Sequence, residues 1–466
     1  MNTDDLPGLR PLWTALGADT ALLERVSRTG PRGGLPARLP VMALARAAVG
    51  ACALAAAELA AVRTGGPVPR VRVDDEAVAA AFLSDRLVRV DGRAPVTFAP
   101  LSRFWRAADG WVRTHANYPH HRARLLTALG LPDGAGPDAV AALIAGRSAR
   151  DVEDTVYAAG GLAVAARTVE QWTAGEQGSL VAGRPLLTLE RIGETAPTRA
   201  WGPLPAGPLL PCAGVRVLDL TRVLAGPVAT RTLALLGADV LRIDPPHLPE
   251  SQDAHDDTGM GKRSTTLDLR RAADHRVFED LLRDADVVVT GYRPGALDRF
   301  GLSPEALAGR RPGLVVARLS AWGRQGPWHE RRGFDSLVQA ATGIALREGR
   351  GDEPGALPAQ ALDHGTGYLL AAAVLRALTE ATGRDGGGTW LAEAALTRTA
   401  HWLVHELTGP PEPAGPLDPE RRTAVAATPR GRLRHALPPV AYDGAPPDWT
   451  RPSGRWGADR AEWTGP

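Results

Sequence analysis

One aspartate, Asp363, stands where an alanine-rich helical segment begins, and its surroundings suit a carboxylate nucleophile. It is followed by His-Gly-Thr-Gly, and two glycines would let another molecule approach the backbone closely. A helix N-terminus keeps a carboxylate ionised and offers N–H groups to a nearby oxyanion. The simpler interpretation is that Asp363 only accepts hydrogen bonds from the first N–H groups of its own helix. The local sequence leaves both roles open.

A second copy of this segment lies near the beginning of the chain and lacks the aspartate. Residues 357–383 align without a gap with residues 39–65, and 8 of the 27 aligned positions are identical. Ala45 takes the position of Asp363. We therefore expect two related helices, of which the earlier is a degenerate copy of the later one.

From Gly214 onward, short aliphatic runs alternate with helical segments. The helices are predicted after Pro227, around 276–283, at 303–311 and at 334–346. The runs between them predict strands at 215–220, 238–244, 264–269, 285–292 and 313–323. This alternation is typical of an α/β fold, with a Rossmann-like parallel sheet and helices on both faces.

The first 200 residues have a different pattern, which predicts a smaller α+β domain. It contains the helix at 39–65, a strand at 70–75, a hairpin arm at 107–116 and helices at 147–161 and 167–175. We predict four parts: the small domain at 1–200, a Gly/Pro-rich linker at 201–211, the parallel-sheet domain at 212–408 and a Pro/Arg-rich tail at 409–466. We expect the tail to be extended and to wrap over a neighbour, with anchors at Trp449, Trp456 and Trp463.

Composition excludes several functional classes. The 466-residue chain has a net charge of +2, which favours neither nucleic acid nor an anionic membrane as a partner. Cys52 and Cys212 are too few for a disulfide framework or a metal site. The acidic start is not that of a signal peptide, and the apolar run at 49–62 is shorter than a membrane span. We expect a soluble, cytoplasmic protein. Lys262 is the single lysine of the sequence.

The common catalytic motifs are absent. The histidines at 115–121 and the pair His401 and His405 lack His-Glu-x-x-His spacing, so we expect no metal ligands. The chain contains no G-x-G-x-x-G, Walker A or G-x-S-x-G pattern. The turn after 215–220 nevertheless lies where α/β sheets bind ligands, outside the carboxyl ends of the strands.

Residues 212–400 resemble the family III CoA-transferases, which include formyl-CoA and carnitine CoA-transferases. Residues 107–133 and 147–172 resemble the small domain of that family, which normally follows the catalytic helix. The chain is therefore expected to have the family III fold in a permuted or fused order. The resemblance in the sheet domain is carried, in order, by the segments 214–246, 261–269, 285–302, 319–328, 331–343 and 361–378.

The resemblance implies a covalent mechanism on Asp363. This aspartate would attack an acyl-CoA thioester, form an anhydride and then an aspartyl-CoA thioester, and pass CoA to a small carboxylic acid. Coenzyme A is then a substrate and not a permanently bound cofactor. The family also implies a homodimer, or a fused pseudo-dimer within one chain. The residues expected to bind CoA are Val223, Leu224, Ala225, Leu267, Leu269, Arg270, Tyr292, Arg299, Phe300, Arg332 and Phe334.

Two alternatives follow from positions that differ from the family. An α-methylacyl-CoA racemase or acyl-CoA isomerase of the same superfamily would have a histidine where this chain has Phe334. A non-catalytic CoA-binding protein would accommodate Pro245, where some members have an Arg, and Gly291, where many have Asn.

Overall fold

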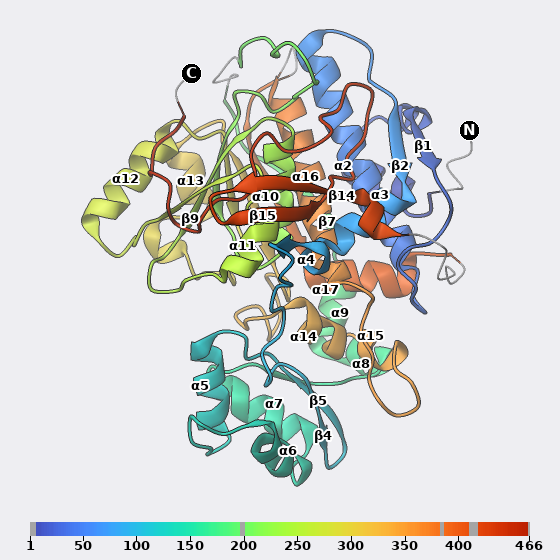
Figure 1. Cartoon of the computed structure of the whole chain (residues 1–466), viewed down its shortest axis with the longest axis vertical. Coiled ribbons are helices and arrows are strands. Elements are labelled where there is room, and N and C mark those ends of the chain that lie inside the picture. Colours follow the sequence, from blue (N-terminus) through green and yellow to red (C-terminus); the bar gives the residue numbers. More distant parts are fainter. Residues whose placement is uncertain (1–5, 196–200, 383–385, 410–417, 465–466) are drawn as a thin grey trace.

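A parallel sheet forms the centre of the computed structural model, which describes residues 6–195, 201–382, 386–409 and 418–464 (Figure 1). The sheet has seven strands in the order β10-β9-β8-β11-β12-β13-β7. The first six are parallel, and β7 pairs antiparallel with β13 at the edge. The predicted α/β fold with a parallel sheet is confirmed. The strands are β7 (Leu187–Gly193), β8 (Arg216–Leu220), β9 (Asp239–Asp244), β10 (Arg263–Thr266), β11 (Val287–Thr290), β12 (Val315–Ser320) and β13 (Thr389–Ala395).

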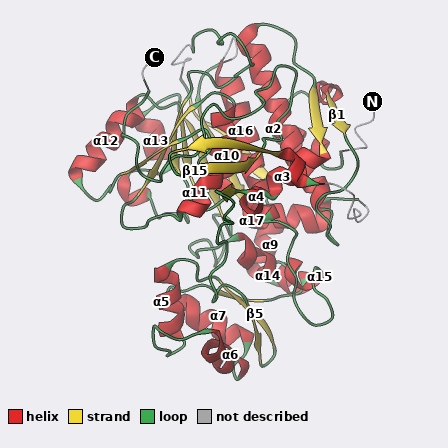
Figure 2. Cartoon of the chain, in the orientation of Figure 1, coloured by secondary structure: helices red, strands yellow, loops and turns green. Residues whose placement is uncertain are grey.

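Helices cover both faces of this sheet because successive strand residues point to opposite sides. Val217 and Val289 belong to the core beneath one group of helices, whereas Leu218 and Val288 belong to a second core on the other face. The first group is α2 (Val41–Thr64), α10 (Ala225–Leu235) and α16 (Ala361–Thr382); the second is α12 (Ala272–Arg283) and α13 (Pro304–Arg310) (Figure 2).

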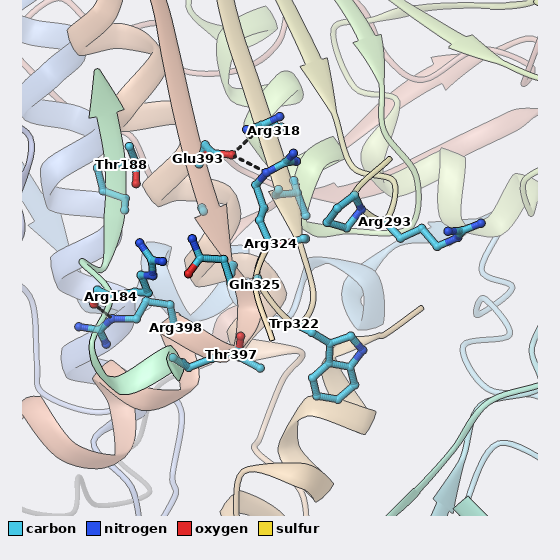
Figure 3. A pocket seen from close by; sticks show the side chains of 18 of the residues that line it. Arg184, Thr188, Arg293, Arg318, Trp322, Arg324, Gln325, Glu393, Thr397 and Arg398 are labelled. Atoms are coloured by element: carbon cyan, nitrogen blue, oxygen red, sulfur yellow. Dashed lines mark hydrogen bonds and ion pairs between the residues drawn. The ribbon is translucent and has the colours of Figure 1, made fainter. Parts of the chain in front are cut away.

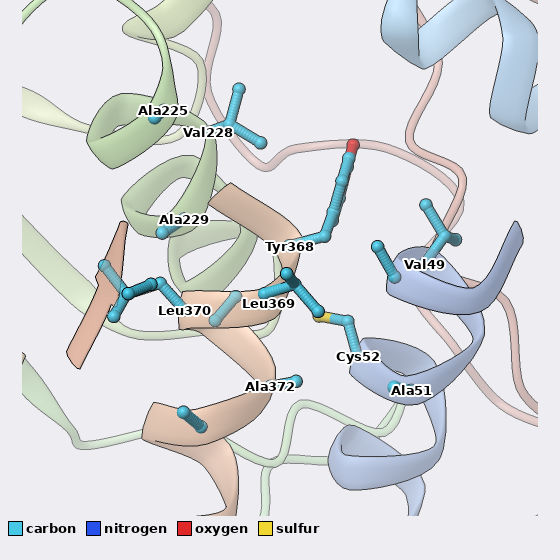
Figure 4. Packing of buried hydrophobic residues seen from close by; sticks show 14 of the residues in the cluster. Val49, Ala51, Cys52, Ala225, Val228, Ala229, Tyr368, Leu369, Leu370 and Ala372 are labelled. Carbon is cyan, nitrogen blue, oxygen red and sulfur yellow. The ribbon is translucent and has the colours of Figure 1, made fainter. Parts of the chain in front are cut away.

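The two helices of the internal repeat, α2 and α16, pack side by side in the first core (Figure 4). A Cβ on Gly365 would lie 2.6 Å from the Leu44 side chain, so the glycine permits the close approach near both helix starts. Among the described residues, α2 is the helix that is long and apolar enough to cross a membrane, but 94% of that stretch is buried inside the protein. Its apolarity is that of a core helix.

The predicted segment 1–200 contributes to two different cores. Its central part has a core of its own around Val112, Leu125 and Ile144, built on β4 (Phe104–Ala107), β5 (Gly110–Thr114), β6 (Ala163–Ala165), α5 (Pro119–Ala128), α6 (Pro137–Ala145) and α7 (Ala149–Ala158). Most of the remainder shares the core of the main sheet through α1 (Leu9–Ala15), β1 (Val26–Thr29), α2, β2 (Val71–Asp74), α3 (Asp75–Phe82), α8 (Val169–Ala174), α9 (Glu176–Ala182) and β7. Helix α4 (Ser84–Leu87) instead contributes Leu87 to a small cluster with Ala80 and Ala436.

Two predicted elements differ from the structure. The helix expected at 334–346 is broken into α14 (Asp335–Ala341) and α15 (Ile344–Arg347), because Gly343 between them has a φ of 86°. The tail is not extended throughout, since β14 (Thr423–Thr428) and β15 (Gly431–Ala436) form a hairpin that pairs with β3 (Arg89–Val90). Residues 1–5, 196–200 and 410–417 of the predicted parts lie outside the described residues.

The C-terminal tryptophans attach the tail to the sheet domain of the same chain. Their indole N–H groups donate to backbone or carboxylate oxygens on α10, at the end of β9 and on α12. The donors and acceptors are Trp449 to Arg231 O (2.8 Å), Trp456 to Asp244 Oδ2 (2.9 Å) and Trp463 to Leu281 O (3.1 Å).

Candidate active site

Asp363 is the third residue of α16, and its side chain is only 7% exposed. Within the described residues its carboxyl group has no hydrogen bond or ion pair. The helix is capped instead by Asp335, whose Oδ2 accepts from the backbone N–H groups of Leu362 (2.9 Å) and Asp363 (3.0 Å). Capping is therefore done by another residue, which leaves the Asp363 carboxyl available for chemistry. Two of the first N–H groups of α16, which the sequence offered to an oxyanion, therefore donate to Asp335 instead.

Two neighbouring carboxyl groups act on Asp363. Burial, followed by the nearby charges of Asp335 and Asp85, raises the pKa of Asp363 well above its usual range. Burial also raises the pKa of Asp335 to about 6, although the hydrogen bonds that its carboxylate accepts act to lower that pKa. Burial and Asp257 likewise raise the pKa of Asp85 to about 6. An Asp363 carboxylate is thus costly to form and, once formed, is more basic and more nucleophilic than an exposed one.

The start of α10 lies against the same side of α16 as Asp363. Gly367 follows Asp363 by one turn, and a Cβ on Gly367 would lie 2.5 Å from the carbonyl oxygen of Ala225. Among the described residues, the N–H groups of Ala225 and Gly226 donate no hydrogen bond, as is usual for the first turn of a helix. These N–H groups are free backbone donors beside α16.

The loop that leads into α10 is strained. Val223 has a φ of 68°, a conformation that costs a β-branched residue on the order of 1–3 kcal/mol. Its N–H donates to Glu250 Oε2 at 3.2 Å, and Arg222 donates to the carbonyls of Leu248 and Pro249. The surrounding contacts hold the loop in place, as is common where a loop binds a ligand.

Lys262 supports this loop from below. Its buried Nζ donates to Asp219 Oδ2 (3.0 Å), to the carbonyl of Pro227 (3.0 Å) and to Thr230 Oγ1 (2.5 Å). The end of β8 is thereby tied to the first turns of α10. The single lysine of the chain has a structural role beneath the predicted CoA loop.

Phe334 lies in a cluster of aromatic side chains from the N-terminal segment. The His115 ring stacks on it with centroids 3.7 Å apart, and His121 meets it edge-on at 5.9 Å. Tyr118 is 6.4 Å from Phe334, carries the Arg222 guanidinium 5.1 Å over its ring and donates to Glu250 Oε1 at 2.8 Å. Since Arg222 precedes the predicted CoA loop, the structure brings Phe334 and that loop together through Tyr118.

Arginines surround this cluster, and sequence reasoning missed most of them. Burial, followed by the nearby charges of Arg293 and Arg124, lowers the pKa of Arg332. Arg124 and Arg332, together with Arg222, also lower the pKa of His120, after burial. Such a group of cations suits phosphate groups. The general abundance of arginine hid Arg124, Arg222 and Arg293, although Arg293 directly follows Tyr292 after β11.

The other predicted CoA residues are more widely spread. Leu267, Leu269, Tyr292 and Phe300 pack at the core of the α12 face, on the opposite side of the sheet from Leu224, Ala225 and Phe334. Arg299 is exposed with its guanidinium 4.7 Å over the Phe300 ring, and Arg270 is exposed and paired with Asp268 at 2.8 Å. The structure thus groups Val223–Ala225 with Phe334 and Arg332, but leaves Arg270 and Arg299 at the periphery.

A cavity of about 360 Å³ lies at the carboxyl ends of β11, β12 and β13 (Figure 3). Tyr292 and Arg293 line one side of it, and Trp322, Arg324 and Thr397 line others. Glu393 pairs with both Arg318 and Arg324, as the dashed lines in Figure 3 mark. This cavity is basic overall and adjoins the predicted CoA residues through Tyr292.

A second cavity, of about 290 Å³, lies at the N-terminus of α16. Gln360 directly precedes the helix and lines this cavity together with Gln339, the partner of Asp335. The opposite wall comes from the N-terminal segment and includes Phe98, Phe104 and Arg113. Asp363 therefore has a cavity beside its helix start, bounded by both parts of the chain.

The aligned helix α2 has no carboxylate at the position of Asp363. Ala45 is fully buried, and the adjacent Arg46 makes a buried ion pair with Asp75, with Nη2 2.5 Å from Oδ2. In α2, a structural ion pair therefore lies next to Ala45, the residue that aligns with Asp363.

Residues 212–431 match the model of CoA-transferase family III. An acetyl-coenzyme A transferase of Hypoxylon pulicicidum is 34% identical over 219 residues, which are 45% of this chain and 37% of that protein. A "probable fatty acyl-CoA transferase" of Mycobacterium tuberculosis is 36% identical over 193 residues, 37% of this chain and 48% of the relative. An acetyl-CoA:oxalate CoA-transferase of Acetobacter aceti is 37% identical over 161 residues, 32% of this chain and 41% of the relative.

The chain thus spans less than half the length of each of these relatives. Among solved structures, a hypothetical protein from Mycobacterium tuberculosis is 33% identical, with a TM-score of 0.40 over 42% of this chain and 57% of that one. A CAIB/BAIF family protein from Brucella suis is 26% identical, with a TM-score of 0.37 over 48% of this chain and 65% of that one.

Proposed function

We propose that this chain, whose residues 212–431 match CoA-transferase family III, moves CoA from an acyl-CoA to a carboxylic acid through covalent intermediates on Asp363. The observation that carries the proposal is the carboxyl of Asp363, buried at a helix start whose cap is supplied by Asp335. A carboxylate that served only to cap its helix would hold those hydrogen bonds itself.

The proposed reaction proceeds by four exchanges at carbonyl carbons. An Asp363 oxygen attacks the thioester carbonyl, the C–S bond breaks, and CoA thiolate leaves behind an aspartyl anhydride. The thiolate attacks the Asp363 carbonyl carbon and releases the donor acid, which leaves an aspartyl-CoA thioester. The acceptor carboxylate displaces the thiolate to form a second anhydride. The thiolate then attacks the acceptor carbonyl and restores the Asp363 carboxylate.

The surroundings of Asp363 support each negative charge in this sequence. The free N–H groups of Ala225 and Gly226, at the start of α10, are suited to hold the tetrahedral oxyanion. The cations Arg124, Arg293 and Arg332 suit the phosphates of CoA. Burial would strip water from the carboxylate and from the thiolate. We further propose a cytoplasmic location and either a homodimer or a pseudo-dimer formed within one chain.

The decisive experiment is mass spectrometry of the Asp363 peptide after incubation with a panel of acyl-CoAs. We expect a covalent acyl or CoA adduct on this peptide, trapped as a hydroxamate by hydroxylamine. The adduct should be absent in Asp363→Asn and present in a control in which an exposed carboxylate far from the site is changed, Asp280→Asn. An unmodified Asp363 with every acyl-CoA tested, in a protein that binds CoA, would establish a non-catalytic CoA-binding protein instead.

A racemase is the second candidate because the imidazole of His115 lies on the ring of Phe334. Burial and Arg113 lower the pKa of His115 to about 3, so this imidazole is a weak base at neutral pH and favours the transferase. Incubation of a chiral 2-methylacyl-CoA in deuterated buffer separates the two. Incorporation of deuterium at the α-carbon without CoA exchange would support racemisation.

A further inference from the structure

Arg113 is a buried arginine without a counter-ion. It lies on β5 in the N-terminal segment and is 9% exposed. Among the described residues its guanidinium makes no hydrogen bond and no ion pair, and its Nε is buried without any partner. Its close neighbours are the faces of Phe98 and Phe104, each with its ring centroid 5.2 Å from the guanidinium carbon. A buried cation of this kind is rare unless a charged partner binds to it.

Asp335 acts on Arg113 electrostatically but, among the described residues, makes no ion pair or hydrogen bond with it, and both of its oxygens accept from other groups. Oδ1 accepts from Gln339, and Oδ2 accepts from the N–H groups of Leu362 and Asp363. The charge of Arg113 is therefore left facing the 290 Å³ cavity that it lines.

A second unsatisfied group lines the same cavity. The hydroxyl of Ser336 is buried and has no hydrogen-bond partner among the described residues. Ser336 lies on α14 next to Asp335, and Gln360 at the start of α16 also lines the cavity. One wall thus presents a hydroxyl and an amide, and the other presents a cation between two aromatic rings. An anion with an apolar body matches both walls.

We propose that this cavity binds the acceptor acid, with Arg113 as the residue that holds a carboxylate and Phe98 and Phe104 packing against an apolar or aromatic body. Ser336 donates a hydrogen bond to the same carboxylate. The N-terminal segment thereby supplies the acceptor site to the Asp363 of its own chain. This assignment rests on the transferase function proposed above, but acid binding can be measured without acyl-CoA or turnover.

Direct titration calorimetry tests the site with phenylacetate, benzoate and butyrate as probes, and with succinate and oxalate as small dicarboxylates, at matched ionic strength. We expect the aromatic acids to bind most tightly. Arg113→Met should weaken phenylacetate binding by about 10- to 100-fold, because a charged hydrogen bond is lost. Arg113→Lys should restore part of the affinity, and Ser336→Ala should have a smaller effect of the same sign. Tighter binding of succinate or oxalate would overturn the apolar-body assignment.

The matched control is Arg106→Met. Arg106, on the adjacent strand β4, also lies over an aromatic ring, 5.4 Å from the Trp111 centroid, but it is exposed and paired with Asp352. The Arg106→Met variant should bind phenylacetate with the affinity of the unchanged protein. Thermal melting without ligand separates binding from a structural role: Arg113→Met should melt no lower than the unchanged protein, because it removes an unpaired buried charge. A lower melting temperature together with unchanged phenylacetate affinity would make Arg113 a structural residue and overturn the proposal.

Failure of this site and failure of the transferase proposal have different signatures. If the Asp363 adduct forms from acyl-CoA but Arg113→Met changes neither phenylacetate binding nor the acceptor KM, the acceptor site lies elsewhere. In the expected case, Arg113→Met raises the KM for the acceptor acid, while the Asp363 adduct still forms from the acyl-CoA donor. If no adduct forms with any donor, Arg113-dependent binding of phenylacetate still identifies the cavity as an acid-binding site.

Discussion

Glu58 and Arg376 occupy equivalent positions of the two repeated helices and face each other, with Oε2 2.7 Å from Nη1. In a pair of identical helices related by a two-fold axis, this position would meet its own copy, and two like charges would repel each other. The two copies have instead diverged to unlike charges. The helices α2 and α16 are therefore matched as a non-identical pair within one chain.

The first prediction concerns this ion pair. Arg376→Gln leaves Glu58 largely buried without its cation, and we expect a loss of about 3 kcal/mol in the free energy of unfolding. The double variant with Glu58→Gln should recover part of that loss, because both charges are then gone. Denaturant-induced unfolding of the unchanged protein, the two single variants and the double variant measures the coupling free energy between the two charges. The control is Glu380→Gln, the more exposed partner of Arg376, for which about 0.5 kcal/mol is expected. Additive single effects would mean that the pair is not coupled.

The second prediction is that Asp363 destabilises the fold. Because burial raises its pKa above that of the unfolded chain, the folded state favours the protonated carboxyl. Stability therefore falls as the pH rises from the ordinary pKa of an aspartate toward the raised value. Asp363→Asn removes this penalty, and we expect a higher melting temperature at pH 7 to 8 with a smaller gain at pH 4. A lower melting temperature at neutral pH would contradict the raised pKa.

The third prediction is the pH dependence of chemistry at the same residue. The nucleophile is the ionised carboxylate, whose fraction grows as the pH passes upward through the raised pKa. Rapid-quench measurement of Asp363 adduct formation from acyl-CoA should therefore show a rate that still increases with pH above the ordinary titration range of an aspartate. A rate that is constant from pH 5 upward would indicate a carboxylate with an ordinary pKa.

The fourth prediction separates the cap from the nucleophile. Asp335→Ala removes the acceptor of the Leu362 and Asp363 N–H groups, and we expect a loss of about 1–2 kcal/mol in unfolding free energy. Removal of the neighbouring charge should also lower the pKa of Asp363 and shift the adduct-formation profile to lower pH. A matched cap elsewhere, Ser303→Ala at the start of α13, should cost a similar stability without moving that profile.

The fifth prediction concerns Lys262, which lies below the predicted CoA loop. Lys262→Met leaves Asp219 buried without its cation, which we expect to cost about 3–5 kcal/mol. Because Nζ also holds Pro227 and Thr230, the variant should weaken CoA binding measured by calorimetry. In the double variant Lys262→Met/Asp219→Asn, most of the stability should return. CoA affinity that is unaffected in either variant would show that the loop does not depend on this lysine.

The sequence was sufficient for the features that depend on local pattern. Alternating aliphatic runs and helical segments determine a parallel sheet, since such strands need crossover helices and bury both faces. The alignment of 39–65 with 357–383 identified the repeated helix, and the family resemblance singled out Asp363. The positions of helix breaks and caps were harder to predict from the sequence. Gly343 interrupts a helix because its φ is positive, which the sequence does not specify.

Only the tertiary structure decided which distant groups share one site. Asp335 and Asp363 are 28 positions apart, and their hydrogen bond exists because α14 and α16 meet end to end. Arg113 and Phe334 belong to parts of the chain that a sequence pattern treats separately. Side-chain type sets what a residue can do, whereas burial and neighbours decide which charges are paired and which are left free for a ligand. The sequence therefore determined the fold and proposed Asp363 as a nucleophile, and the packing determined the environment of that carboxyl group.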